Sequence, residues 1–252
     1  QADTHIANMM TMKNALALSS NYVTAYLMKQ LSAEGVIELA RKMGIESEIE
    51  AYPAICLGTP NISLYEMLRA YSTYINQGFY TEPFAINRIE DRQGNVLAIF
   101  QPTKTEAMSS ETAYTMLNIM KDVSKNGTAK RLQYQYGFDN AIAAKTGTTN
   151  DNSDGWFIGL TPQIAAGIWV GGDDKSIHFL STALGQGANT ALPIWANFMN
   201  EIYADSTLNI QKEAIFERPK NYFQDLDCEK RQQEILPLFE DKFDRDYNDV
   251  FD

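Results

Sequence analysis

The segment Lys145-Thr146-Gly147-Thr148-Thr149 combines residue types that can bind and polarise a substrate. It supplies a cation, hydroxyl donors and a glycine at which a ligand can approach the backbone closely. An apolar run rich in β-formers precedes it, and a polar loop at 150–153 follows. On an edge strand beside a cleft, such a segment suits a substrate that carries a carboxylate. An isolated Lys-Thr-Gly tripeptide is more often only a strand that ends in a polar turn, so it needs a companion.

A second polar group, Ser19-Ser20-Asn21, interrupts a helical pattern near the start of the chain. Its S-x-N arrangement offers a hydroxyl that can relay a proton and an amide that can hold a peptide group. At a turn between two helices, the side chains of Ser19 and Asn21 could face one cleft. Serine and asparagine are also the commonest helix caps, so the group is informative only together with the Lys145 segment, in this order.

Further segments accompany these two, and from about Asn8 to Asn200 the chain resembles the transpeptidase domain of class A penicillin-binding proteins. This family joins a glycosyltransferase to a transpeptidase. The segments that carry the resemblance are Ala15-Leu16-Ala17-Leu18-Ser19-Ser20-Asn21, Ser63 to Gly78, Asn126-Gly127-Thr128-Ala129, Lys145 to Thr149, Asp154 to Pro162 and Ile168 to Gly171.

The resemblance implies an α+β fold in which an antiparallel sheet is packed between helices. It also implies the function of a peptidoglycan D,D-transpeptidase that acts at the periplasmic side of the bacterial cytoplasmic membrane. The partners implied are peptidoglycan stem peptides and β-lactams, with a membrane anchor in the parent protein. No cofactor and no metal are implied.

The resemblance also assigns roles to individual residues. Ser19 and Lys145 would pass protons during acylation and deacylation, and Asn21 would hold the substrate amide. Thr146 and Thr148 would bind the terminal carboxylate of the donor stem or of a penicillin, while Gly147 keeps the strand clear of the ligand. The backbone N–H of Thr148 would form half of an oxyanion hole. Trp156, on the next predicted strand, is expected in the core, because aromatic residues in strands usually pack there.

The family's first motif, S-x-x-K, is missing from the 252 residues, since no serine is followed three positions later by a lysine. In the family this motif supplies the serine that attacks the substrate carbonyl and the lysine that helps to activate it. It lies several tens of residues before S-x-N, whereas 18 residues precede Ser19 here. We therefore expect the nucleophile upstream of Gln1, and we expect the chain alone to be inactive.

Two alternative functions remain open. A D,D-carboxypeptidase or serine β-lactamase shares the motifs but passes the acyl group to water, and turnover with and without an acceptor amine separates it from a transpeptidase. A non-catalytic module that binds peptidoglycan or a β-lactam would also lack S-x-x-K. The coding sequence upstream of Gln1 separates this second alternative from an enzyme, because only an enzyme should have S-x-x-K there.

Composition excludes several other classes of function. The net charge of −11 argues against nucleic acid binding, because the sequence lacks the clustered Lys and Arg that a phosphate backbone requires. The two histidines, His5 and His178, leave little room for a zinc site or a Ser-His-Asp triad. Cys56 and Cys228 have no metal or redox spacing, and their pairing is left open. The start of the chain lacks a signal peptide pattern, and no stretch approaches the length of a membrane span.

The periodicity of apolar residues predicts the elements that must position these groups. Two helices joined at Ser19-Ser20-Asn21 are expected within 11–31, then a helix between Ser32 and Gly44 and another from the capping box at Ser63 to Gly78. The pattern then predicts a β-hairpin over 84–100 with its turn at 92–95, a helix over 110–124, strands over 141–145, 156–160 and 164–170, and a helix over 187–203.

Beyond Tyr203 the composition changes. The segment from Glu201 to Asp252 holds 14 acidic and 7 basic residues, so it contributes −7 of the net charge. We expect one domain over 1–203 and an acidic extension over 204–252. Its aromatic residues, among them Phe216, Tyr222, Phe223, Phe239 and Phe243, are too frequent for a wholly disordered tail, so part of it should dock on the domain.

Overall fold

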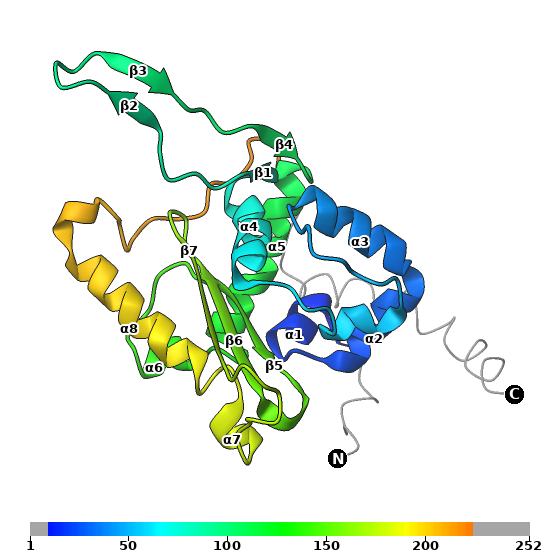
Figure 1. Cartoon of the computed structure of the whole chain (residues 1–252). Helices are drawn as coiled ribbons and strands as arrows, with labels where there is room; N and C mark the ends of the chain where they lie inside the picture. Colours follow the sequence, from blue (N-terminus) through cyan, green and yellow to red (C-terminus); the bar gives the residue numbers. More distant parts are fainter. Residues whose placement is uncertain (1–9, 224–252) are drawn as a thin grey trace, which may run out of the picture.

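A three-stranded antiparallel sheet forms the centre of the computed structural model, which describes residues 10–223 (Figure 1). Its strands are β5 (Ala143–Thr148), β6 (Asp154–Leu160) and β7 (Ala165–Gly171), in the order β5-β6-β7. α8 (Ala191–Ala204) covers one face, where Trp195 packs against Phe157. α4 (Leu64–Ile75) and α5 (Ser110–Lys125) cover the other. The α+β fold predicted from the sequence is confirmed.

Two glycines allow the helices to approach this sheet closely. A side chain at Gly159 would collide with the indole of Trp195 on α8, and one at Gly167 would press on Leu64 and Leu68 of α4. Because neighbouring residues of a strand point to opposite faces, the two glycines serve opposite faces of the sheet. The core accordingly has one apolar cluster on each face.

The amino-terminal part consists of α1 (Met12–Ala17), α2 (Asn21–Gln30), α3 (Ala33–Lys42) and the short 3₁₀ helix η2 (Pro53–Leu57). The predicted break between the first two helices lies at Leu18–Ser20. Ser32 caps α3 by accepting from the Gly35 amide, and Gly44 ends it in the left-handed conformation at φ 91°. These start and stop signals are local, which explains why the sequence predicts the helix.

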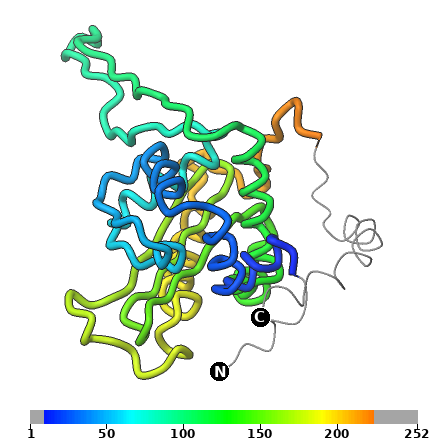
Figure 2. Tube along the Cα trace, turned by 90° about the vertical axis from the view of Figure 1, so that its right-hand side faces the viewer, coloured from blue at the N-terminus to red at the C-terminus, as the bar shows by residue number. Residues whose placement is uncertain are grey.

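The helices α4 and α5 also begin where the sequence predicts. Ser63 and Glu66 form the capping box of α4, and Ser109 caps α5 through the amide of Thr112. Between the two helices, β1 (Phe79–Thr81) pairs with β4 (Lys104–Glu106), and the hairpin of β2 (Arg88–Glu90) and β3 (Val96–Ile99) projects from the body (Figures 1 and 2). Gly94 forms the predicted turn with φ 87°.

The remaining described elements are short: α6 (Arg131–Tyr134), η3 (Asn150–Asn152), α7 (Thr182–Gly185) and η4 (Ser206–Leu208). Within residues 10–223, none of the helices is long and apolar enough to cross a membrane.

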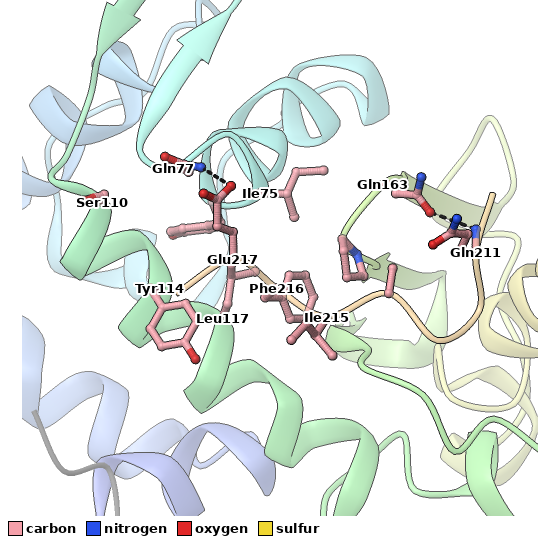
Figure 3. Close-up of a pocket in the computed structure, with 13 residues that line it drawn as sticks. Ile75, Gln77, Ser110, Tyr114, Leu117, Gln163, Gln211, Ile215, Phe216 and Glu217 are labelled. Carbon is pink, nitrogen blue, oxygen red and sulfur yellow. Dashed lines mark hydrogen bonds between the residues drawn. The ribbon is translucent and has the colours of Figure 1, made fainter. Parts of the chain in front are cut away.

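After α8 the chain returns across the domain. Phe216 is buried in the cluster under α4 and α5, and the ring of Tyr222 lies edge-on to Tyr114 with centroids 4.9 Å apart. These two aromatic residues dock, as predicted for part of the segment, whereas Phe223 is exposed. A cavity of about 320 Å³ lies where 211–217 passes α4 and α5, and Figure 3 shows the residues that line it. Cys228, Phe239 and Phe243 lie outside the described residues. The boundary at 203 thus remains a prediction.

Candidate active site

Ser19 and Asn21 lie in the tight reversal between α1 and α2. The first helix ends at Ala17, and Ser19 adopts the left-handed conformation with φ 55°, which is uncommon for a residue with a side chain. Ser20 then occupies the cap position of α2, and Asn21 is its first residue. Both Ser19 and Asn21 are exposed, so their polar groups are accessible.

Lys145 reaches this reversal from β5. Its ammonium group donates to the Ser19 hydroxyl at 2.7 Å and to the Thr146 carbonyl at 2.7 Å, although Ser19 and Lys145 are 126 positions apart. Burial lowers the pKa of Lys145 to about 8, because the charged form loses contact with water. The structure therefore brings Ser19 and Lys145 together, as the sequence predicts, around an amine that can give and take a proton near neutral pH.

Thr146 and Thr148 point away from Lys145, to the face of the sheet that α8 covers. Thr146 is buried, and its hydroxyl is 2.8 Å from that of Thr128. Thr148 is exposed, and its hydroxyl oxygen accepts from the Gly187 amide at 3.1 Å, which leaves the hydroxyl proton to donate. Of the two threonines, Thr148 is thus the better placed to meet a carboxylate.

β5 is an edge strand of the sheet, and its register shows which backbone groups point away from β6. The Thr149 amide donates across to the Asp154 carbonyl, and inward and outward groups alternate along an antiparallel strand. The N–H of Thr148 and the carbonyl of Thr146 therefore point to the open edge. An amide donor directed at open space beside Lys145 is the arrangement that an oxyanion hole requires.

Gly147 lies opposite Trp156 on the neighbouring strand. A side chain at position 147 would stand 3.0 Å from the Trp156 side chain, so the glycine is needed for packing as well as for access to the edge. Trp156 itself is not a core residue: it is partly exposed and packs beside Trp169. The core prediction for Trp156 is wrong, because its neighbours across the sheet are Gly147, which has no side chain, and Trp169, which is itself exposed.

Asp154 organises the turn that follows β5, a role that the sequence patterns do not predict. Its carboxylate accepts from the Trp169 indole and the Ser153 hydroxyl at 2.9 Å each, and from the Thr149 hydroxyl at 3.1 Å. Burial alone would raise the pKa of Asp154, but these hydrogen bonds lower it. The available signal was an aspartate at the first position of a strand after a polar loop.

Other groups lie apart from this site. His178 is exposed and contacts the Phe179 carbonyl. Among residues 10–223, no three His, Cys, Asp or Glu side chains gather to hold a metal ion. The cavity in Figure 3 is lined by none of Ser19, Asn21 and Lys145, so the groove expected beside β5 remains a prediction.

Comparison with known proteins places this chain in a family. Residues 1–173 match the family described as the penicillin binding protein transpeptidase domain. The sequence is 33% identical to penicillin-binding protein 1A of Aquifex aeolicus over 76% of this chain and 26% of that protein. It is 32% identical to penicillin-binding protein 1B of Haemophilus influenzae over 90% of this chain and 28% of that protein.

Solved structures show the same fold. Penicillin-binding protein 1A from Haemophilus influenzae superposes with a TM-score of 0.71 at 23% identity, over 84% of this chain and 36% of that one. The PonA1 protein from Mycobacterium tuberculosis, in complex with penicillin V, superposes with a TM-score of 0.68 at 21% identity, over 84% and 60%.

The chain belongs to the penicillin-binding protein transpeptidase family. Its relatives named penicillin-binding protein 1A and 1B confirm the predicted resemblance to the class A members. The chain spans about a quarter of the length of these two relatives.

Proposed function

We propose that the protein to which this chain contributes is a serine-type D,D-transpeptidase that cross-links peptidoglycan and is acylated by β-lactams. The observation that carries the proposal is the contact between Lys145 and Ser19 next to the free edge of β5. An amine with a pKa of about 8 against a hydroxyl forms a proton relay, and the edge supplies amide donors for a developing oxyanion.

The reaction transfers an acyl group in two steps. A serine hydroxyl attacks the carbonyl of the penultimate D-alanine of a stem peptide, its proton passes to a base, and terminal D-alanine leaves with a proton on its amine. The amine of a second stem then attacks the ester, gives up a proton and restores the serine. The nucleophile is expected in an S-x-x-K motif upstream of Gln1, since none occurs within the 252 residues.

The residues of this chain would serve both steps. Lys145 and Ser19 exchange the proton, and the Asn21 amide holds the peptide group of the donor. The Thr148 N–H stabilises the oxyanion, and its hydroxyl binds the terminal carboxylate. Thr146 would join in carboxylate binding only if its hydroxyl turned from Thr128, so its part is the less direct.

The substrate fixes the setting of the parent protein. Peptidoglycan stem peptides lie outside the cytoplasmic membrane, so the domain would work on the periplasmic side, held there by an anchor elsewhere in the protein. Neither a cofactor nor a nucleic acid takes part in this proposal.

The test is acylation and turnover of the full-length protein. We expect a fluorescent penicillin to label the wild type, labelling to fall at least a hundredfold in Lys145→Met, and His178→Ala to match the wild type. With a D-alanyl-D-alanine donor, an added amine acceptor should give a transfer product. Release of free D-alanine without transfer would identify a carboxypeptidase, and failure to label at all would identify a non-catalytic relative.

A further inference from the structure

The turn Asn126-Gly127-Thr128 lies between the two elements that carry Ser19 and Lys145. It follows directly on α5, where Asn126 caps the helix and the Gly127 amide donates to the Asp122 carbonyl at 3.0 Å. The Asn126 side chain adds a hydrogen bond of 2.7 Å to the Asp122 carboxylate. The turn is therefore held rigidly at the end of the longest helix that packs on the sheet.

On one side this turn is bonded to α1. The Thr128 amide donates to the carbonyl of Ala17 at 3.0 Å, a carbonyl at a helix end that has no partner within its own helix. Gly127 is buried against the same carbonyl, so closely that any side chain at position 127 would overlap it. Ala17 is the last residue of α1, two positions before Ser19.

On the other side the turn is bonded to β5. The hydroxyls of Thr128 and Thr146 lie 2.8 Å apart, and Thr146 directly follows Lys145. Among the hydrogen bonds of residues 10–223, the one from Lys145 to Ser19 is the only direct link between the end of α1 and β5. Thr128 connects the two elements indirectly, because its amide bonds to Ala17 of α1 and its hydroxyl to Thr146 of β5.

We propose that Thr128 is a positioning residue that sets the separation of the Ser19 hydroxyl and the Lys145 ammonium group by bonding to both elements that carry them. The inference rests on the proposed function, because the separation matters only if protons pass between these groups. Proton transfer requires heavy atoms within about 3 Å, and a displacement of about 1 Å lowers rates by up to a hundredfold.

The decisive variant is Thr128→Val in the full-length protein, which keeps the shape of the side chain and removes the hydroxyl. We expect penicillin acylation to slow about tenfold to a hundredfold. Thr128→Ser, which restores the hydroxyl, should return the rate to within about threefold of the wild type. The pH at which acylation is half-maximal should rise in Thr128→Val, because a Lys145 that leaves its contact with Ser19 is better hydrated.

Thr115→Val is the matched control, because it removes a hydroxyl pair of the same kind, between Thr115 and Tyr222, at a distance from the site. It should lower thermal stability as much as Thr128→Val does while leaving acylation unchanged. If both variants slow acylation equally, Thr128 has only a structural role and the inference fails.

A crystal structure of the Thr128→Val protein gives a readout that does not depend on activity. We expect the Ser19 hydroxyl and Lys145 ammonium group, 2.7 Å apart here, to separate beyond hydrogen-bond distance. An unchanged separation would overturn the inference whatever the rates are. If the wild type is not labelled by penicillin but the separation grows, the proposed function fails and the positioning role of Thr128 stands.

Discussion

In the proposed site, the amine that this chain supplies is Lys145, which is partly withdrawn from water and faces the Ser19 hydroxyl. A lysine in water is almost wholly protonated at pH 7 and cannot accept a proton. With the pKa lowered to about 8 by burial, about a tenth of the Lys145 side chains are neutral at pH 7. Withdrawal from water is therefore what would let Lys145 act as the base that we propose, without a histidine.

This pKa predicts how acylation depends on pH. In the proposed mechanism the neutral amine is the reactive form, so the acylation rate of the full-length protein should rise with pH from 6 and level off above about 8. Measurement of penicillin acylation from pH 6 to 9.5 checks this. In Lys145→Arg the guanidinium stays charged, so the rate should fall and the limb near pH 8 should vanish. A wild-type profile that is flat across this range contradicts the assignment.

Asn21 and Thr148 should contribute through polar contacts made while the acyl bond forms. We expect Asn21→Ala and Thr148→Ala to slow acylation by β-lactams about tenfold to a thousandfold, the range found when one such donor is removed. Stopped-flow measurement with a chromogenic cephalosporin gives the rate. If neither substitution changes it, the site lies elsewhere.

Among the elements, α4 shows how one side chain can secure the scaffold behind the site. Glu66 is buried and accepts from the backbone amides of Glu46, Ser47 and Ser63 and from both serine hydroxyls. These hydrogen bonds, with that from the Ser47 hydroxyl foremost, hold the pKa of Glu66 far below its usual range. The carboxylate thereby joins α4 to the loop after α3.

Glu66→Gln should destabilise the protein by about 2–4 kcal/mol, because the amide presents donors to groups that are themselves donors. Since the folded-state pKa is lowered, the contribution of Glu66 is complete above the unfolded value of about 4.3 and is lost as pH falls below it. Thermal unfolding at pH 7 and pH 3.5 should therefore show a gap between variant and wild type that narrows in acid. Glu38→Gln, which breaks an exposed pair with Lys42, should leave the unfolding temperature unchanged at either pH, because water screens an exposed ion pair.

The elements with local signals are the ones that the sequence predicts well. Ser63 starts α4 and Gly94 turns the hairpin for reasons contained in a few neighbouring residues. β1 and β4 escape prediction, because strands of three residues are too short to show an alternation. α8 begins four residues later than its periodicity indicates, at Ala191, and Gly187 before it donates its amide to Thr148.

The site, too, has features that the local sequence predicts and features that depend on tertiary packing. The chemistry and order of Ser19, Asn21 and Lys145 are readable in the sequence. The partner of Thr146 is not, because its bond to Thr128 arises only when β5 packs beside the end of α5. The exposure of Trp156 likewise depends on strand pairing, which sets it between Gly147 and the exposed Trp169.

In the molecule as a whole, the segment after α8 packs on the domain even though it is more acidic than the rest of the chain. Phe216 is buried beneath α4 and α5, whereas Phe223, seven residues later, is 87% exposed. Phe216→Ala should lower stability by about 3–5 kcal/mol, and Phe223→Ala should have no measurable effect. Thermal unfolding of both variants tests this, and truncation after Tyr203 tests the predicted domain boundary. Equal stabilities for Phe216→Ala and the wild type would show that the segment does not dock in solution.

We also expect the 252-residue chain alone not to be acylated by penicillin. A stable acyl-enzyme needs a serine with an adjacent base, and no serine of the 252 residues is followed by lysine in S-x-x-K spacing. Ser19 is the tempting substitute, since it contacts Lys145 at 2.7 Å. Yet Lys145 donates to the Ser19 oxygen in this contact, so it does not take the hydroxyl proton that a nucleophile must lose. Ser19 should therefore remain an alcohol.

Intact-mass spectrometry after prolonged incubation with excess penicillin measures this directly. We expect no added mass on the 252-residue chain and stoichiometric addition to a chain extended upstream through S-x-x-K. Ser19→Ala in the extended chain should slow the addition without abolishing it, because loss of a proton relay lowers the acylation rate, whereas loss of the nucleophile stops acylation. Stoichiometric addition to the short chain, lost in Ser19→Ala, would instead make Ser19 the nucleophile and reverse the roles argued for the site.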